Sequence, residues 1–205
     1  MEFGIFYSEI AAVMKQTGKN FFDVCCDMRK LGYKYVELAL EELSNDKLLI
    51  FRENYMHISA LYCTFDPAAD NCGKIEQLSK MAYLADADFV IPVLKGNGGE
   101  VELLKKIASG LAGKKSRLAV APELYKNIAG EIPDCVCCPD IPADNGSLQD
   151  AAYIHVSDVS GSEKAFHNLL DTGYDRIVTV NIQGDDLEAA LKEAIETLKK
   201  RCGQE

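Results

Sequence analysis

Short runs of β-branched and aromatic residues alternate along this chain with longer segments of helical period, and Gly, Asp, Asn or Pro separates them. The short runs are typical of buried strands, and the longer segments carry apolar residues at helical spacing. A helix between two strands returns the chain to the start of the next strand, so that neighbouring strands run in parallel. The alternation therefore predicts an α/β fold built on a parallel sheet.

The count of these runs narrows the choice of architecture. We expect strands at residues 3–7, 35–40, 58–65, 89–94, 118–121, 135–138, 153–156 and 176–182, and helices at about 20–31, 42–54, 74–84, 101–111, 163–170 and 187–200. The fifth and sixth connections are shortened, since residues 123–134 hold only a turn or two of helix and residues 144–151 are equally brief. Eight strands with eight connections predict a compact (β/α)₈ barrel, the TIM barrel. An open doubly wound sheet is the alternative, because 205 residues are fewer than the roughly 250 usual for that barrel.

Composition bounds the domain count and the class of partner. No linker or shift in composition divides the chain, and an apolar share of 48% supports one core, so we expect a single barrel domain over residues 1–205. The net charge of -10, from 22 basic and 32 acidic residues, disfavours binding to nucleic acid or to an anionic membrane. We find no secretion-signal pattern and no run near the roughly 20 apolar residues of a membrane span, which predicts a cytoplasmic protein.

Short motifs stand in order at the ends of the expected strands. They are Leu31-Gly32-Tyr33 with Tyr35-Val36-Glu37-Leu38, Ala121-Pro122-Glu123, Ile154-His155-Val156-Ser157-Asp158, and Thr172-Gly173-Tyr174-Asp175 with Val178-Thr179-Val180-Asn181. With these motifs the chain resembles the xylose-isomerase-like barrel superfamily, which comprises sugar isomerases, epimerases and endonuclease-IV-like proteins. The resemblance covers essentially the whole chain and implies a TIM barrel with its functional surface at the C-terminal ends of the strands.

The resemblance also implies a divalent metal, Mn²⁺ or Mg²⁺ with Zn²⁺ as a further option, held by Glu123, Asp140, His155 and Asn181. The first three match the family's ligands, whereas Asn181 stands where the family has Glu. A Glu, an Asp and a His that converge from strand ends would by themselves suit a hard cation, because oxygen ligands predominate.

The family's reaction is proton abstraction next to a carbonyl, with a metal that polarises the sugar oxygens and two carboxylates as base and acid. Glu123 would be the catalytic carboxylate here, and Glu37 and Asp158 would contact the substrate. An amide cannot accept a proton near neutral pH. With Asn181 in place of the second carboxylate, the reaction rate would fall by about the 10²–10⁴-fold that acid–base assistance contributes.

We therefore expect a metal-dependent sugar or sugar phosphate isomerase or epimerase whose two-carboxylate site is incomplete. The alternative is a catalytically impaired barrel, with no metal if the site is degenerate, that binds a small carbohydrate or a protein partner. Subunits could also associate as a homo-oligomer, to cover the side that the short helices leave thin.

Several of these residues have a purely structural alternative. His155 could be a hydrogen-bonded core histidine, Asp140 could cap a tight turn, and Glu37 could cap the loop after its strand. The cluster Cys135, Cys137 and Cys138 lacks the paired C-x₂-C spacing of zinc motifs, which predicts buried thiols. The glycine-rich residues 96–99 do not match a phosphate-binding loop pattern, and we expect an ordinary βα loop there.

Overall fold

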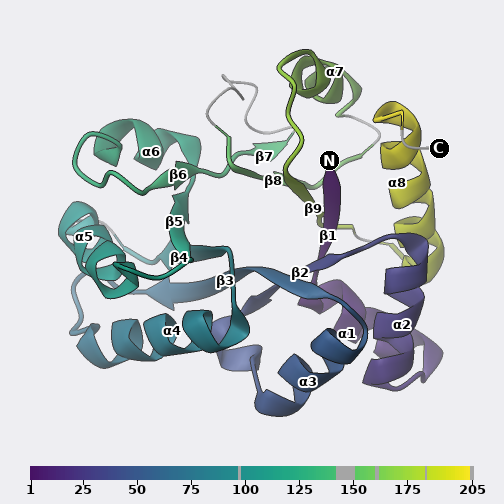
Figure 1. The fold of residues 1–205 in the computed structure, drawn as a ribbon, viewed down its shortest axis with the longest axis horizontal. Helices are drawn as coiled ribbons and strands as arrows, with labels where there is room; N and C mark the ends of the chain where they lie inside the picture. The colour runs from purple at the N-terminus through teal and green to yellow at the C-terminus, as the bar shows by residue number, and fades with distance from the viewer. Residues whose placement is uncertain (97, 142–150, 160–161, 183, 204–205) are drawn as a thin grey trace.

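The structure, a computed structural model, describes residues 1–96, 98–141, 151–159, 162–182 and 184–203. Figure 1 shows a ring of strands with the helices packed around its outside. The strands are β1 (Glu2–Phe6), β2 (Tyr35–Ala39), β3 (His57–Phe65), β4 (Phe89–Leu94), β5 (Arg117–Val120), β6 (Val136–Cys137), β7 (Asp140–Ile141), β8 (Tyr153–Val156) and β9 (Ile177–Val180). The helices are α1 (Tyr7–Thr17), α2 (Phe21–Leu31), the 3₁₀ helix η1 (Leu40–Glu42), α3 (Asn45–Glu53), α4 (Cys72–Ala85), α5 (Glu100–Leu111), α6 (Pro122–Ile128), α7 (Glu163–Asp171) and α8 (Leu187–Arg201).

All strand pairs are parallel, and the order β6-β5-β4-β3-β2-β1-β9-β8-β7 closes on itself. The segments β6 and β7 are two halves of one strand position, separated by Cys138 and Pro139. On one side, the Cys138 N–H donates to the Val120 carbonyl of β5 at 2.8 Å. On the other, the His155 N–H of β8 donates to the Pro139 carbonyl at 3.0 Å. The ring therefore has eight strand positions, which confirms the predicted TIM barrel over the open sheet.

The first connection differs from the prediction, because it holds two helices rather than one. The sequence pattern predicts only the helix that the structure shows as α2. Helix α1 starts directly after β1 and ends at Gly18, whose left-handed conformation (φ 72°) lets its N–H donate to the Met14 carbonyl at 2.9 Å. Gly18 is thus the C-cap that marks the missed helix.

The first of the two shortened connections lies where the sequence placed it. Helix α6 has seven residues, which confirms the turn or two expected between β5 and β6. The next connection passes through residues 142–150, which lie outside the described residues. No helix within the described ranges is long and apolar enough to cross a membrane.

The barrel has an apolar layer on each side of its strands. Outward-facing strand residues pack against the helices in one large core, and a smaller cluster fills the inside of the ring: Ala60, Phe89, Ala119, Cys138, Ala152, Tyr153 and Ile177. Small residues leave space there for the Phe89 and Tyr153 rings, whose centroids lie 5.1 Å apart. Gly4 likewise leaves space, in this case for Thr179, since a Cβ at position 4 would lie 2.6 Å from Thr179 Oγ1.

The cysteine cluster and the glycine-rich loop both have structural roles. Cys135, Cys137 and Cys138 are buried free thiols, as the spacing predicted. In the glycine-rich loop, the Gly98 N–H donates to Glu100 Oε1 at 2.7 Å. A carboxylate of the chain itself thus occupies the backbone donor that a phosphate would need.

Candidate functional site

A network of polar side chains lies inside the barrel and joins four of its strands. We call it the Glu37 cluster, and its members are Glu37 of β2, Ser59 of β3, Tyr153 and His155 of β8, and Thr179 of β9. Side chains two apart on a strand share a face, so Tyr153 and His155 both point into the ring. The cluster joins residues as far apart in sequence as Glu37 and Thr179.

One oxygen of Glu37 accepts two hydrogen bonds. The Tyr153 hydroxyl donates to Glu37 Oε2 at 2.6 Å, and His155 Nε2 lies 2.8 Å from the same oxygen. The side chain of Glu37 is only 2% exposed. Burying a carboxylate is costly unless it is paired, and here one imidazole and one phenol hold it.

Two hydroxyl groups complete the network around Tyr153. The Tyr153 oxygen lies 2.9 Å from Ser59 Oγ and 2.5 Å from Thr179 Oγ1. Ser59 Oγ also donates to the Val36 carbonyl at 3.2 Å. Because the single phenolic proton goes to Glu37, Tyr153 acts toward Thr179 as an acceptor.

His155 carries the charge that opposes Glu37. Burial lowers the pKa of the imidazole, but the Glu37 carboxylate and Cys138 together raise it by more, and the pKa of His155 lies well above its usual range. The side chain is 20% exposed, so it is the part of the pair that solvent can reach. At neutral pH His155 is protonated and donates a hydrogen bond to Glu37.

Cys138 does not turn this pair into a nucleophilic triad. Its sulfur lies 3.9 Å from His155 Nε2, the same nitrogen that binds Glu37. A relay through a histidine needs two different ring nitrogens. Burial also raises the pKa of Cys138, which keeps it a thiol.

A second buried carboxyl group lies close to the cluster. Glu9, in the first turn of α1 directly beyond β1, is 4% exposed. Burial raises its pKa to about 7, although hydrogen bonds from the backbone and from Ser8 partly oppose this and the nearby Glu37 adds to it. A carboxyl group that titrates near 7 can take up or release a proton at neutral pH.

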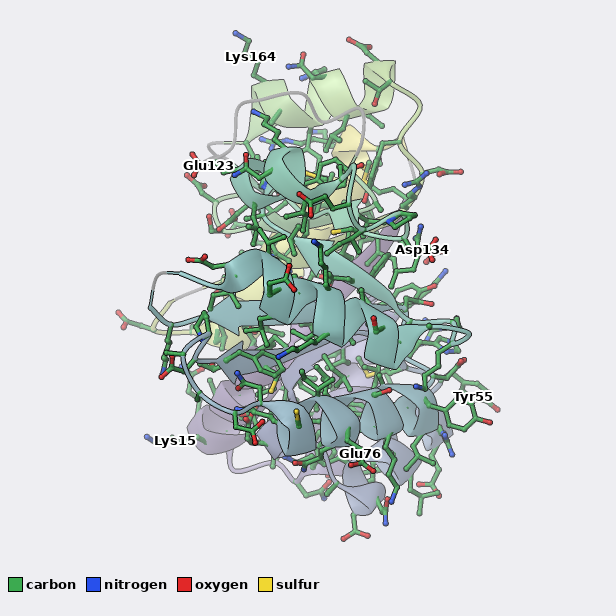
Figure 2. All side chains as sticks on the ribbon, turned by 90° about the vertical axis from the view of Figure 1, so that its left-hand side faces the viewer. Lys15, Tyr55, Glu76, Glu123, Asp134 and Lys164 are labelled. Carbon is green, nitrogen blue, oxygen red and sulfur yellow. The ribbon has the colours of Figure 1, made fainter. Side chains whose placement is uncertain are left out.

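The residues predicted as metal ligands all lie toward the C-terminal ends of strands. Asp140 of β7 is in register with His155 of β8, and Asn181 follows β9, where its N–H donates to the Val156 carbonyl at 2.9 Å. Glu123 is exposed in the first turn of α6. In the side view of Figure 2, Glu123 lies at one end of the barrel, with Asp134 and Tyr55 at the opposite end.

These four residues do not fit the expected metal. Among the residues that the structure describes, no group of three or more His, Cys, Asp or Glu side chains is placed to hold a metal ion. The nitrogen ligand, His155, is bound to Glu37 through Nε2, and a protonated imidazole cannot coordinate a cation. Glu123, Asp140 and Asn181 are exposed.

The two expected substrate contacts have different surroundings. Glu37 lies at the centre of the cluster and not on the surface of the mouth. Asp158 is exposed after β8 and, with Ser157, Ile182 and Glu193, borders a pocket of about 240 Å³ against α8.

Some members of the site were missed in the sequence. The spacing from His155 could have found Tyr153, two residues earlier on the same strand face. Nothing local pointed to Glu9, because the helix that carries it was not expected.

Comparison with known proteins places the fold. The chain matches no protein-family model and no curated protein. Among solved structures, it is similar to an AP endonuclease, family 2, from Brucella melitensis, with a TM-score of 0.72 and 12% identity over 93% of this chain and 96% of that one. A sugar phosphate isomerase/epimerase from Parabacteroides distasonis has a TM-score of 0.68 and 10% identity over 96% of this chain and 93% of that one.

A duf72 family protein from Enterococcus faecalis is a more distant match, with a TM-score of 0.55 and 11% identity over 98% of this chain and 95% of that one. At these identities the comparisons show the fold, because few side chains are shared. They agree with the closed ring of eight strand positions described above.

Proposed function

We propose, on the premise of the TIM barrel fold that this chain has, that it transfers a proton next to the carbonyl of a small sugar or sugar phosphate. The reaction class is that of an isomerase or epimerase, and the site is the C-terminal mouth of the barrel. The observation that carries the proposal is the buried Glu37–His155 pair, 2.8 Å apart, with a second buried carboxyl group, Glu9, beside it. The similar fold of a protein described as a sugar phosphate isomerase/epimerase supports the substrate class.

The side chains divide the work by charge. Because Nε2 of His155 binds Glu37, the Nδ1–H of the protonated imidazole is the donor to the carbonyl oxygen. Glu37 keeps His155 protonated and oriented. Glu9, with a pKa of about 7, takes the proton from the carbon next to the carbonyl while His155 protonates the carbonyl oxygen, which gives an enediol. His155 then accepts the proton of the other enediol hydroxyl as Glu9 returns its proton to the former carbonyl carbon from the same face.

No step of this scheme passes through a metal, since the expected ligands do not form a group that fits one. The assignment can be checked directly with a chelator. Activity that disappears with EDTA and returns with added Mn²⁺ would contradict it.

The main experiment is exchange of solvent deuterium into sugars. Purified protein is incubated in D₂O with a panel of aldoses, ketoses and their phosphates, and NMR follows the signal of the carbon-bound hydrogen next to the carbonyl. We expect exchange with at least one sugar, and a loss of about 10²–10⁴-fold in Glu9→Gln and in His155→Gln. The matched control is Glu196→Gln, which neutralises an exposed carboxylate on α8.

The exchange experiment has two outcomes that reject the proposal. One is that no sugar of the panel exchanges with the wild-type protein. The other is exchange that Glu9→Gln and His155→Gln leave unchanged.

A carbohydrate-binding protein without turnover is the second candidate. The observation in its favour is the 2% exposure of Glu37, which Tyr153 and His155 shield from a ligand. Saturable binding of a sugar without deuterium exchange would favour this candidate over the enzyme.

Action on nucleic acid receives no support from the charge of the chain. The Brucella melitensis neighbour is described as an AP endonuclease, but a net charge of -10 repels a phosphate backbone. We propose a small-molecule substrate in the cytoplasm instead.

A further inference from the structure

A second pocket lies at the N-terminal end of the barrel, opposite the Glu37 cluster. Its volume is about 460 Å³, which suits a small ligand. Residues at or near the starts of six strands line it: Glu2, Tyr35, Asp88, Phe89, Lys115, Arg117, Ala152, Asp175, Arg176 and Ile177.

The apolar part of this lining belongs to the filled interior of the ring. Phe89, Ala152 and Ile177 are members of the inner cluster, and the Phe89 ring packs on Tyr153. Tyr153 is fully buried and reaches Glu37 on its far side. Packed side chains thus lie between the two ends, which makes the N-terminal pocket a separate site.

The carboxylates of the pocket have lysine partners in two of three cases. Glu2 pairs with Lys34 at 2.8 Å, and Asp88 pairs with Lys115 at 3.0 Å. The third carboxylate is Asp175. These pairs leave the two arginines of the pocket to face a single carboxylate.

The two guanidinium groups are sparsely used by the protein. The guanidinium of Arg117 lies over the Phe89 ring, 5.2 Å from its centroid, and within the described part of the chain it makes no hydrogen bond or ion pair. Among the residues that the structure describes, the guanidinium of Arg176 has one hydrogen bond, from Nη1 to the Ala151 carbonyl at 3.3 Å. Most of their N–H donors are therefore available to a ligand.

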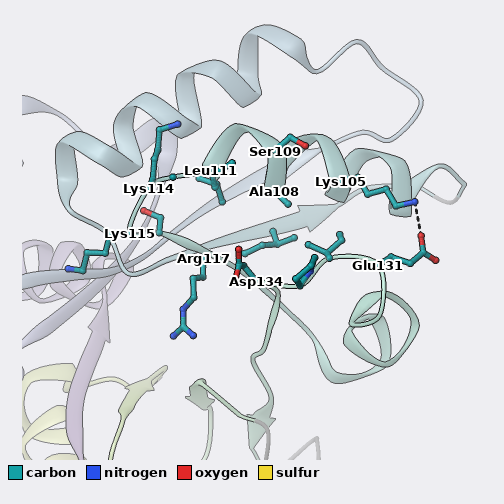
Figure 3. A pocket seen from close by; sticks show the side chains of 15 residues that line it. Lys105, Ala108, Ser109, Leu111, Lys114, Lys115, Arg117, Glu131 and Asp134 are labelled. Carbon is teal, nitrogen blue, oxygen red and sulfur yellow. Dashed lines mark ion pairs between the residues drawn. The ribbon is translucent and has the colours of Figure 1, made fainter.

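Arg117 also borders a neighbouring pocket beside α5, but its guanidinium does not point toward α5 (Figure 3). That pocket, of about 600 Å³, also has Arg117 in its lining. Figure 3 shows the Arg117 side chain extending away from α5, while Lys105 reaches across to Glu131, at 2.6 Å. On that rim Lys105 is paired with Glu131, and the guanidinium of Arg117 is directed elsewhere (Figure 3).

We propose that the N-terminal pocket binds a small organic anion. Arg117 and Arg176 bind its acid group, because a guanidinium offers paired N–H donors that match a carboxylate or phosphate. Phe89 and Ile177 contact its apolar part. This site differs from the proposed catalytic mouth in position and in ligand.

Isothermal titration calorimetry with three probes tests the proposal: benzoate, phenyl phosphate and inorganic phosphate. We expect one saturable site for benzoate or phenyl phosphate, and weaker binding of inorganic phosphate, which lacks an apolar part. Tighter binding of benzoate would identify a carboxylate ligand, and tighter binding of phenyl phosphate a phosphate ester.

Variants tie the binding to the two arginines. Hydrogen bonds to charged groups support a loss of affinity of about 10- to 100-fold in Arg117→Gln and in Arg176→Gln. Arg52→Gln is the matched control, because Arg52 is exposed on α3 and donates one hydrogen bond to a backbone carbonyl, that of Leu84. If Arg176→Gln does not fold, Arg117→Lys keeps the charge but loses the paired donors and should still bind more weakly.

Three results would overturn the proposal. These are no saturable binding of any probe at millimolar concentration, unchanged affinity in the Arg117 and Arg176 variants, or an equal loss in Arg52→Gln. None of them depends on the Glu37 cluster, so the proposed enzyme activity stands or falls separately.

Discussion

Replacing Glu37 by Gln removes one charge from the interior of the barrel and leaves the shape of the side chain nearly unchanged. The oxygen that is lost as an anion accepts from Tyr153 at 2.6 Å and from His155 at 2.8 Å. His155 then has no carboxylate beside it, and burial, the largest influence on its pKa, lowers that pKa. We expect a less stable protein whose buried histidine is neutral.

The size of the effect follows from the cost of breaking a buried ion pair. Removing one partner of such a pair costs about 3–5 kcal/mol. For a domain of this length, each kcal/mol lowers the melting temperature by about 2–4 °C. Glu37→Gln should therefore lower the melting temperature by at least about 6 °C.

The stability difference between wild type and Glu37→Gln should depend on pH. The pKa of His155 is raised in the folded protein, so its stabilisation is fully present below its unfolded value of about 6.5 and is lost as pH rises through the folded pKa. The gap between wild type and Glu37→Gln should be largest near pH 6 and should narrow at higher pH. Glu9 titrates in both proteins, and its contribution largely cancels in the difference.

Thermal unfolding followed by circular dichroism at pH 6 and pH 9 measures this gap. Glu196→Gln on α8 makes the same chemical change at an exposed position and should leave the melting temperature nearly unchanged. A decrease below about 2 °C for Glu37→Gln at pH 6, or a gap that widens with pH, would refute the charge assignment.

Three further changes test the surroundings of the cluster. Glu9→Gln should be about 3 kcal/mol more stable than wild type at pH 8 and equal to it near pH 4 in urea unfolding. The reason is that the folded pKa of about 7 makes wild-type stability fall as pH rises from 4.5; an equal gap at both pH values would contradict it. Tyr153→Phe leaves the polar neighbours of the hydroxyl without that partner and should lower the free energy of unfolding by about 1–3 kcal/mol. Calorimetry that shows no change would contradict this. Gly4→Ala places a Cβ 2.6 Å from Thr179 Oγ1 and should cost about 1–3 kcal/mol, whereas Gly73→Ala, with nothing within 4 Å, should be neutral or stabilising in the same melts.

Local pattern was sufficient for most of the elements. Apolar runs such as residues 89–94 and 153–156 coincide with β4 and β8 as the structure has them. Helix α1 was missed because the run ending at Tyr7 was assigned to the strand, although Gly18 carried the signal of a helix end. The two halves β6 and β7 were not foreseen as separate segments, since the interruption comes from pairing with β5 on one side and β8 on the other.

The site was predictable only in part. His155, Glu123, Asp140 and Asn181 all lie toward the C-terminal ends of strands, because parallel strands bring those ends to one face. Which carboxylate reaches His155 was not predictable from the chain. The partner is Glu37, which the pattern assigned to substrate contact, while Glu123 lies exposed on α6.

The sequence by itself determined the alternation of strands and helices, their parallel direction and the end of the sheet at which polar residues gather. These follow from periodicity, which acts within about ten residues. Only the tertiary structure decided that the ring closes through the divided sixth strand position, and that Glu37 and His155 meet inside it. Their contact depends on the closure and register of the ring. The burial that raises the pKa of Glu9 depends on how α1, which carries Glu9, packs over the ring.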